Sequence, residues 1–349
     1  MTNSFEKIDI LSLFFKELEE EIIKIGEPKF RAKQIYSWIN KGKWSDEMAN
    51  IPVPLRKKLD EHFLWTLPAV EKKLVSQIDG TVKYLFKLYD GEYIESVFMR
   101  YEHGNTLCIS SQVGCRMGCK FCASTLLGRV RNLLPSEMLG QIIMAEKDTG
   151  ERISNVVMMG IGEPLDNYDN TIKFLRLVSD ENGLNIGLRH ISVSTCGLVD
   201  RINDLSNEAL PITLSISLHA YDNDTRSKIM PINNKYPIEA LLDACQKYFE
   251  KTSRRISFEY TLISGQNDTE EGATKLAKIL KKYIKSPCHV NLIPLNEVKE
   301  TGLGTSKNVN NFKNKLMSLG VNATVRRRLG SDINASCGQL RRQAKEERE

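Results

Sequence analysis

The sequence predicts an α/β fold whose centre is a partial parallel barrel of six β-then-α units, a TIM-like (βα)6 arrangement. From about residue 105 onward, apolar strand-like runs alternate with amphipathic helices. Repeated units of this kind imply a parallel sheet. Six units are too few for a complete eight-unit barrel, so an open or partial barrel is the simplest closure.

The predicted strands are short apolar runs between helical segments, and residues 322–326 are a possible further strand. The six runs are 106–111, 155–159, 190–194, 212–218, 256–262 and 289–293. Pro237 stands at a favourable first-turn position and opens one intervening helix. Asp268 and Glu271 have the spacing of a capping box and predict the start of the next helix.

Before the barrel, residues 1–66 predict a small helical domain. Apolar residues recur at three- and four-residue steps from Leu11 to Ile25, and two further helices follow around residues 30–39 and 55–63. Residues 67–100 contain two Asp-Gly turns, at Asp79 and Asp90, which predict hairpins between strand-like runs. We therefore expect a hairpin region at 67–100, a barrel core at 101–331 and a C-terminal segment at 332–349.

Composition favours a cytoplasmic protein with no membrane segment. No apolar run approaches the roughly 20 residues needed to cross a bilayer. The N-terminus is polar and lacks the basic-then-apolar pattern of an export signal. In the cytoplasm, the eight cysteines are more typical of metal binding or catalysis than of structural disulfides.

The formal charge of +5 is modest, but the basic residues are clustered. Between residues 104 and 136 the chain has Arg116, Lys120, Arg129 and Arg131 and no Asp or Glu, and further basic runs stand at 326–328 and 341–342. A phosphate-rich substrate would explain this clustering, although charge alone favours a solvated basic face.

Unusual polar residues follow five of the predicted strands. They are the loop with Cys115, Cys119 and Cys122, the pair Gly162-Glu163, Ser194, the turn Ser217-Leu218-His219, and Asn296. Ligands bind at the C-terminal ends of strands in parallel α/β folds. Five such placements on one rim indicate a single cofactor site.

The three clustered cysteines have the spacing Cys-x3-Cys-x2-Cys. A structural zinc ion would need a fourth ligand, for which His103 or Cys108 is available. An iron–sulfur cube usually binds four cysteines, one per iron, so three would leave one iron open for a chelating substrate.

Glu95 stands in the last strand of the hairpin region and shares one face with Tyr93, Val97 and Met99. A carboxylate among these apolar neighbours would be partly desolvated, as suits a general base. An edge position beside solvent is the alternative.

The cysteine spacing after the first strand of a partial barrel resembles the signature of the radical S-adenosylmethionine (SAM) superfamily. Longer runs look like the RlmN-type adenine-C2 RNA methyltransferases of the RlmN/Cfr family, and this resemblance covers nearly the whole chain. These runs are 108–115 (Cys-Ile-Ser-Ser-Gln-Val-Gly-Cys), 159–167 (Met-Gly-Ile-Gly-Glu-Pro-Leu-Asp-Asn), 217–220, 226–233 and 332–340.

The resemblance implies a role for each matching residue. Cys115, Cys119 and Cys122 would bind one 4Fe-4S cluster whose open iron chelates SAM. Gly162, Glu163, Ser194, Ser217, Leu218, His219 and Asn296 would form the SAM pocket. Cys337 would carry the methyl group, Cys108 would resolve it through a transient disulfide, and Glu95 would accept a proton. Cys196, Cys245 and Cys288 are interpreted as buried small hydrophobic residues.

The resemblance also implies the reaction and its partners. One SAM would methylate Cys337, and a second would yield a 5′-deoxyadenosyl radical that activates the methyl group for addition to adenine C2. The substrates would be 23S ribosomal RNA, in the peptidyl-transferase centre, and transfer RNA, at the adenine 3′ to the anticodon. The helical domain and the basic segments would hold the RNA. Electrons would come from a flavodoxin- or ferredoxin-like donor, and we expect the enzyme to be a monomer.

Three other functions are compatible with parts of the sequence. The related antibiotic-resistance enzymes methylate C8 of the same ribosomal adenine, but Pro164 after Glu163 looks more like the C2 group. A radical SAM activase or maturase would act on a protein. A zinc-containing RNA-binding module would not be an enzyme.

Overall fold

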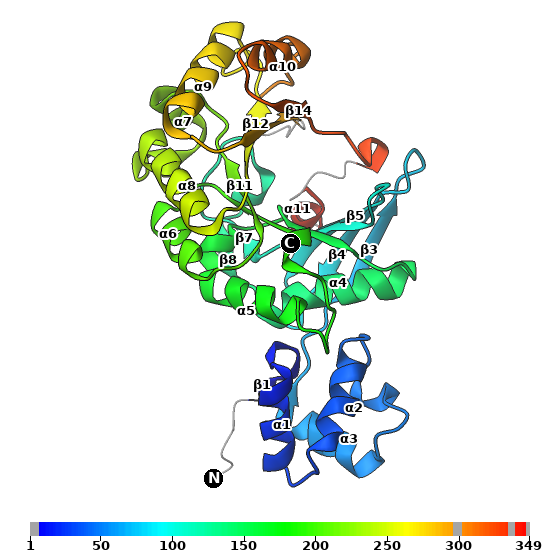
Figure 1. Ribbon diagram of the computed structural model, residues 1–349. Coiled ribbons are helices and arrows are strands. Elements are labelled where there is room, and N and C mark those ends of the chain that lie inside the picture. The colour runs from blue at the N-terminus through cyan, green and yellow to red at the C-terminus, as the bar shows by residue number, and fades with distance from the viewer. Residues whose placement is uncertain (1–6, 296–301, 334–338, 347–349) are drawn as a thin grey trace.

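A ten-stranded mixed sheet organises the computed structural model, which describes residues 7–295, 302–333 and 339–346 (Figure 1). Seven neighbouring strands of this sheet are parallel and curve into a partial barrel. They are β6 (Thr106–Cys108), β9 (Asn155–Met158), β10 (Ile191–Thr195), β11 (Thr213–Ser217), β12 (Ile256–Leu262), β13 (Cys288–Pro294) and β14 (Ala323–Val325). The predicted α/β partial barrel is confirmed, and residues 322–326 do contain a further strand.

Helices cover the outer face of the barrel (Figure 1). These helices are α4 (Pro135–Thr149), α5 (Tyr168–Val178), α6 (Val199–Asn207), α7 (Asn223–Ile229), α8 (Ile238–Thr252), α9 (Glu270–Tyr283) and α10 (Val309–Ser318). Helix α8 begins directly after Pro237, as predicted. The predicted capping box of α9 was wrong by one residue, because the Thr269 hydroxyl accepts the Gly272 amide (3.0 Å) while Asp268 binds Gly265 and Ser306.

Three antiparallel strands extend the parallel sheet beyond β6. They are β3 (Ala69–Val75), β4 (Val82–Lys87) and β5 (Tyr93–Met99), joined by the two predicted Asp-Gly turns. Strand β5 pairs with β4 on one side and with β6 on the other, and every residue in it is buried. Glu95 therefore lies on an interior strand and not at a sheet edge.

Two small additions complete the region around the barrel mouth. An antiparallel hairpin of β7 (Gln112–Gly114) and β8 (Arg129–Asn132) follows β6. At the C-terminal end, a short 3₁₀ helix (Ser331–Ile333) and α11 (Gln339–Glu346) return to the β3–β5 strands (Figure 1). No helix among the described residues is both long and apolar enough to cross a membrane.

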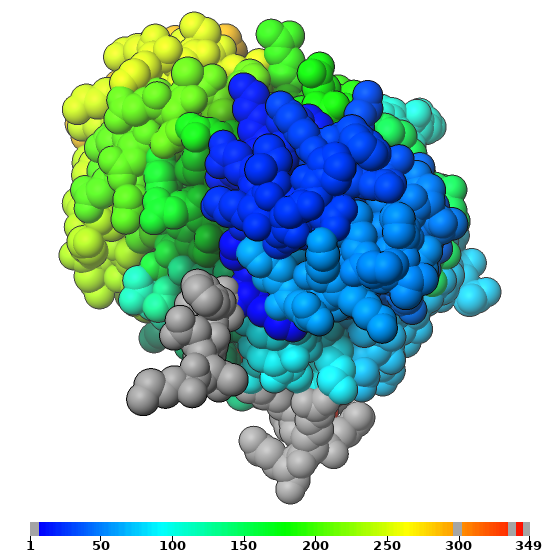
Figure 2. Space-filling model, turned by 90° about the horizontal axis from the view of Figure 1, so that it is seen from below, coloured from blue at the N-terminus to red at the C-terminus, as the bar shows by residue number. Residues whose placement is uncertain are grey.

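The N-terminal helices form a lobe below the barrel (Figure 2). The lobe contains α1 (Phe15–Lys24), α2 (Phe30–Ile39) and α3 (Val53–His62), and a short parallel pair of β1 (Ile8–Asp9) and β2 (Phe63–Leu64) closes it. Its buried side chains are continuous with the main hydrophobic core.

Asp9 is one of several polar links between this lobe and the barrel. One carboxylate oxygen accepts the Ser136 hydroxyl at the start of α4 (2.5 Å) and the Ser12 hydroxyl (2.6 Å). The other oxygen accepts the Thr66 hydroxyl (3.0 Å) at the exit from the lobe. One carboxylate thus joins the entry to the lobe, its exit and the barrel.

We expect Asp9→Ala to loosen the lobe, because it leaves three hydroxyl donors without their acceptor. Each buried polar group that is left unsatisfied usually lowers the free energy of unfolding by about 1–3 kcal/mol. Limited proteolysis should then cut near residue 66 faster, and urea unfolding should begin at lower concentration. Asp60→Ala, on the exposed side of α3, is the matched control. Equal cleavage rates in the two variants would contradict the assigned role of Asp9.

Candidate active site

The three clustered cysteines lie at the C-terminal end of β6, in the loop between β7 and β8. The Cys115 amide donates to the Gly128 carbonyl (3.1 Å), which closes the hairpin at its neck. The Lys120 amide donates to the Ile229 carbonyl (2.9 Å) at the end of α7. The loop is therefore tied to its own hairpin and to the opposite barrel rim.

Burial raises the pKa of all three thiols, that of Cys115 to about 12. The charges of Cys122 and Cys115 add to the effect of burial on Cys119, so the three sulfurs are neighbours. Buried thiolates need nearby positive charge, and iron ions supply it. No three His, Cys, Asp or Glu side chains in the described ranges are arranged around a single ion. An iron–sulfur cube binds each thiolate at a different iron, and these three side chains fit one.

Glu163 lies beside the cysteine loop and is only 4% exposed. One of its oxygens accepts the Leu165 amide (3.0 Å), and the other accepts the Cys196 amide at the end of β10 (2.7 Å). Burial raises the pKa of Glu163, and these hydrogen bonds oppose that rise. The side chains of Thr195 and Cys196 also form hydrogen bonds with this carboxylate, so it is held in place by two neighbouring segments.

Gly162 allows this placement because its φ is +111°. A Cβ atom here would lie 2.6 Å from the Gln112 Cβ atom and 2.7 Å from the Gln112 amide nitrogen. The two segments are bound together, since the Gln112 amide donates to the Ile161 carbonyl (3.1 Å) and the Glu163 amide donates to the Gln112 side-chain oxygen (2.9 Å). A larger residue would push Glu163 away from the cysteines.

Ser194 and Ser217 are half-buried near the ends of β10 and β11. They alternate with buried apolar residues that pack in the main core, so their side chains face the barrel interior. Ser192 and Ser215 lie two residues earlier on the same faces of β10 and β11, and their hydroxyls form a hydrogen bond (2.9 Å). Ser194 and Ser217 therefore lie near the C-terminal ends of two neighbouring parallel strands.

His219 connects β11, β12 and the cysteine loop. Its backbone is left-handed (φ +55°), and its Nδ1 atom accepts the Thr261 amide (2.9 Å). Its ring meets the Phe121 ring edge-on, with centroids 4.9 Å apart. Burial lowers the pKa of His219 to about 3, so the ring is neutral and carries its proton on Nε2. Leu218 beside it is completely buried in the core.

Cys108 and Glu95 lie on one face of the sheet. Cys108 of β6 stands opposite Val97 of β5, and Glu95 is two residues before Val97. Glu95 forms an ion pair with Lys83 of β4 (Nζ to Oε2, 3.1 Å), and both side chains are 0% exposed. The sequence analysis did not single out Lys83.

The C-terminal segment returns to this face at several points. Leu329 packs against the apolar cluster that Cys108 forms with Val97 and Met99. The Gly330 amide donates to Asp79 (2.9 Å), and Asp332 accepts the Gln77 amide (2.8 Å). Beyond residues 334–338, the Arg341 amide in the first turn of α11 donates to Glu95 Oε1 (2.7 Å). Cys337 and Asn296, which the sequence analysis proposed, lie outside the described residues.

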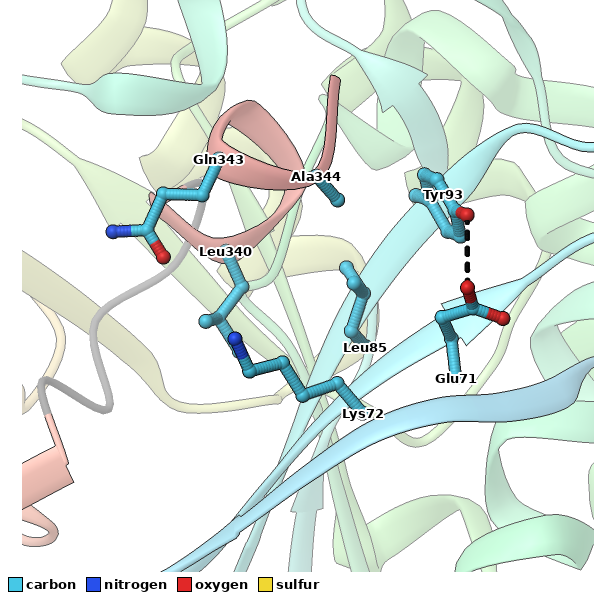
Figure 3. Close-up of a pocket in the computed structure, with 7 residues that line it drawn as sticks. All are labelled: Glu71, Lys72, Leu85, Tyr93, Leu340, Gln343 and Ala344. Atoms are coloured by element: carbon cyan, nitrogen blue, oxygen red, sulfur yellow. Dashed lines mark hydrogen bonds between the residues drawn. The ribbon is translucent and has the colours of Figure 1, made fainter. Parts of the chain in front are cut away.

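Helix α11 is anchored by apolar contacts beside a surface pocket. Leu340 packs with Leu85 and Tyr93, which come from β4 and β5. Figure 3 shows the pocket between Leu340 of α11 and Leu85, with the hydrogen bond from Tyr93 to Glu71 (3.1 Å) on the side away from Leu340. The helix start is therefore held beside Glu95 by packing as well as by the Arg341 amide.

Comparisons with known proteins agree over nearly the full chain. Residues 109–277 match the Radical SAM superfamily, and residues 8–64 match the ribosomal RNA large subunit methyltransferase N-terminal domain. The chain is 55% identical to a probable dual-specificity RNA methyltransferase RlmN of Alkaliphilus oremlandii, covering 97% of this chain and 98% of the relative. A protein of the same name from Clostridium novyi is 53% identical and is covered to 98%.

A solved structure agrees in fold as well as in sequence. The crystal structure of a radical SAM methyltransferase from Sphaerobacter thermophilus has a TM-score of 0.90 and 40% identity, over 95% of this chain and 98% of that one. The chain belongs to the RlmN family. It is a radical SAM methyltransferase and uses a 4Fe-4S cluster and SAM.

The RlmN-family barrel has a polar interior that the sequence analysis missed. Glu259 of β12 is buried, and its oxygens accept hydrogen bonds from Asn291 (2.7 Å) and Ser257 (3.0 Å). The signal was the alternation of polar and apolar residues in 191–195, 213–217 and 256–259. Parallel strands covered on both faces are usually continuously apolar, so alternation here indicates a wet or ligand-filled interior.

The basic residues around the cysteine loop are largely neutralised. Arg116 and Arg129 both pair with Asp166 (2.5 and 2.8 Å), and Arg131 pairs with Asp90 and Glu137 (2.6 and 2.7 Å). Arg341 is buried. The net positive charge of this region is therefore smaller than the sequence of residues 104–136 alone indicated. The folded chain brings acidic partners from other segments.

The other cysteines differ in their surroundings. Cys245 is buried in the main core, which agrees with its interpretation as a small hydrophobic residue, and Cys288 is half-buried at the start of β13. Cys196 is buried with Cys119 in a small cluster at the barrel mouth, and its amide binds Glu163. It is thus closer to the site than its sequence context indicated.

We expect Gly162→Ala to weaken SAM binding by about tenfold or more, since a strained left-handed backbone together with the close contact at Gln112 costs about 1–3 kcal/mol. Equilibrium binding of SAM to the cluster-containing protein measures this. Gly265→Ala is the matched control, because its φ is +71° and its Cβ would enter open space. Equal SAM affinity of the Gly162 variant and the wild type would refute the crowding argument.

His219 should make stability pH-dependent. Below pH 6.5 the unfolded chain binds a proton at His219 that the folded chain excludes down to about pH 3, so stability falls as the pH falls. Between pH 6.5 and 5.0 this loss is about 2 kcal/mol. His219→Asn, which keeps an acceptor and tolerates a left-handed backbone, should remove that loss in urea unfolding, whereas His103→Asn at the surface should not. Identical pH slopes in the wild type and the His219 variant would disprove the assignment.

Proposed function

We propose that this enzyme methylates C2 of an adenine in the peptidyl-transferase centre of 23S ribosomal RNA and of the adenine 3′ to the anticodon in transfer RNAs. The names of its relatives as dual-specificity RNA methyltransferases support this substrate class. The observation that carries the proposal is the anchoring of both flanks of residues 334–338. Before them, Leu329 packs against the cluster that contains Cys108, and after them the Arg341 amide of α11 donates to Glu95.

Cys115, Cys119 and Cys122 would hold the cluster. The SAM pocket would comprise Gly162, Glu163, Ser194, Ser217, Leu218, His219 and Asn296. When bound, the cluster and SAM supply a methyl group and the one-electron chemistry that activates it. The chain's own part is to orient SAM, with Glu163 facing its ammonium group, and to keep water out of the barrel.

Cys337 would receive the methyl group on its sulfur, and its carbon would bond to C2 of the adenine after losing one hydrogen atom to the radical chemistry that the bound SAM supplies. The C2–H bond would then break. Its proton would pass to the Glu95 carboxylate, its electron pair would stay in the purine ring, and the one surplus electron would leave through the one-electron chemistry that the cluster supplies. The Cys108 thiolate attacks the Cys337 sulfur. An S–S bond forms as the carbon–sulfur bond breaks, and the bond's electron pair leaves with the carbon, which takes a proton and becomes the methyl group. An external thiol or electron carrier restores both cysteines.

The adenine must leave its stack to enter such a pocket, as for other enzymes that modify a base. The N-terminal lobe, residues 1–66, would hold RNA outside the barrel core. We further infer that the enzyme works as a cytoplasmic monomer with electrons from a flavodoxin- or ferredoxin-like protein. The RNA-methyltransferase names of its relatives support the location.

C8 methylation is the second candidate, because it would use the same fold and both cysteines. Pro164 after Glu163 and the RlmN names of the relatives favour C2.

Reconstitution with iron, sulfide, SAM, a reductant and a ribosomal RNA fragment tests the proposal. Mass spectrometry of the nucleosides should detect 2-methyladenosine. Cys337→Ala should abolish it, Cys108→Ala should leave RNA covalently attached to the protein, and Cys288→Ala should behave like the wild type. Methyl groups only at C8, or methylation that survives Cys337→Ala, would overturn the proposal.

A further inference from the structure

The buried ion pair between Lys83 and Glu95 is unusual for its setting. Both side chains are 0% exposed, and the Lys83 ammonium lies 3.1 Å from Glu95 Oε2. Lysine is almost never fully buried unless it is paired, and burying two charges costs free energy that a good pair only partly returns. Such a pair is therefore weak evidence for a stabilising role and invites a functional one.

The sheet register places this pair at the proposed reaction centre. Lys83 stands opposite Val97, which in turn stands opposite Cys108, so these three residues form one row across β4, β5 and β6. Glu95 lies in the next row on the same face, opposite Leu85. Diagonal neighbours of this kind are within reach of a long side chain. Lys83 thus approaches Glu95 from the side away from Cys108.

The carboxylate of Glu95 is fixed at both oxygens. Oε2 faces the Lys83 ammonium, and Oε1 accepts the Arg341 amide in the first turn of α11 (2.7 Å). The Arg341 guanidinium faces Glu92 instead, at 3.6 Å. The terminal torsion of a glutamate is otherwise broad, so two partners on opposite oxygens determine the plane of the carboxylate.

We propose that Lys83 is the positioning residue for Glu95 in the methyl transfer, an inference that rests on the proposed function. Lys83 orients the carboxylate and pairs with its ionised form, which is the form that can accept the C2 proton. In that step the C2–H bond breaks, its electron pair stays in the ring, the proton joins Glu95 and one surplus electron leaves through the one-electron chemistry that the cluster supplies. Lys83 touches neither the RNA nor SAM.

The test separates proton removal from the earlier steps. Lys83→Met should cleave SAM and load Cys337 within about twofold of the wild type. It should release methylated RNA at least tenfold more slowly, so the covalent RNA–protein adduct should accumulate. Lys83→Arg should restore most of the release rate. Lys73→Met is the control. It removes the half-exposed ion pair between Lys73 of β3 and Asp148 of α4 and should behave like the wild type.

A double-mutant cycle covers the case in which Lys83→Met folds poorly. Glu95→Gln should slow adduct release, and adding Lys83→Met should slow it no further, because the double variant leaves no uncompensated charge. Release at the wild-type rate in Lys83→Met would overturn the inference. A double variant that releases RNA more slowly than Glu95→Gln would also overturn it. The same holds if Lys83→Met slows SAM cleavage and RNA release to the same extent. If Glu95→Gln itself releases RNA normally, the proposed role of Glu95 fails, and this inference fails with it.

Discussion

The antiparallel pairing of β5 with β6 is the contact on which the rest of the site depends. It spans only Val97–Met99 and Thr106–Cys108, yet it joins the hairpin strands to the parallel barrel. Because side chains alternate across a strand, this register places Cys108 and Glu95 on one face. A slip of one residue would turn one of them to the opposite face. The same strand β6 leads into the cysteine loop, so one pairing positions both halves of the site.

A second constraint fixes the barrel rim from inside the fold. Arg226 is completely buried and donates to the carbonyls of Cys196 (2.7 Å), Ser217 (3.3 Å) and Leu218 (3.1 Å). These carbonyls end β10 and β11, where the backbone stops pairing and would otherwise lose its partners. The run 226–233 therefore matters to the site although none of its side chains was assigned a ligand. It holds in place the strand ends from which Glu163 and His219 are supported.

Local patterns in the sequence predicted most of the elements. Apolar runs located the parallel strands, and Asp-Gly pairs located both hairpin turns around β4. Partners that come from distant parts of the chain could not be predicted in this way. Lys83 lies between the apolar residues Val82 and Tyr84 in β4, and only the packing around β4 and β5 makes it buried. Likewise, Asp166 neutralises Arg116 and Arg129 from some 50 and 37 residues away. Sequence spacing gives residue types and their local conformations, while burial and charge compensation depend on long-range contacts.

Two carboxylates that anchor the C-terminal segment, Asp79 and Glu95, differ in chemistry. Burial alone would raise the pKa of Asp79, but hydrogen bonds from Gly330, Thr81 and Ser76 lower it to about 2, so this carboxylate stays ionised at neutral pH. The second anchor is Glu95, the group that the proposed reaction protonates. A proton on Glu95 removes its charge from both Lys83 and the start of α11, where a carboxylate is favoured by the helix dipole. The hydrogen bond from Gly330 to Asp79 therefore stays the same through the proposed reaction. The interactions of Glu95 with Lys83 and α11 change when Glu95 takes up the proton.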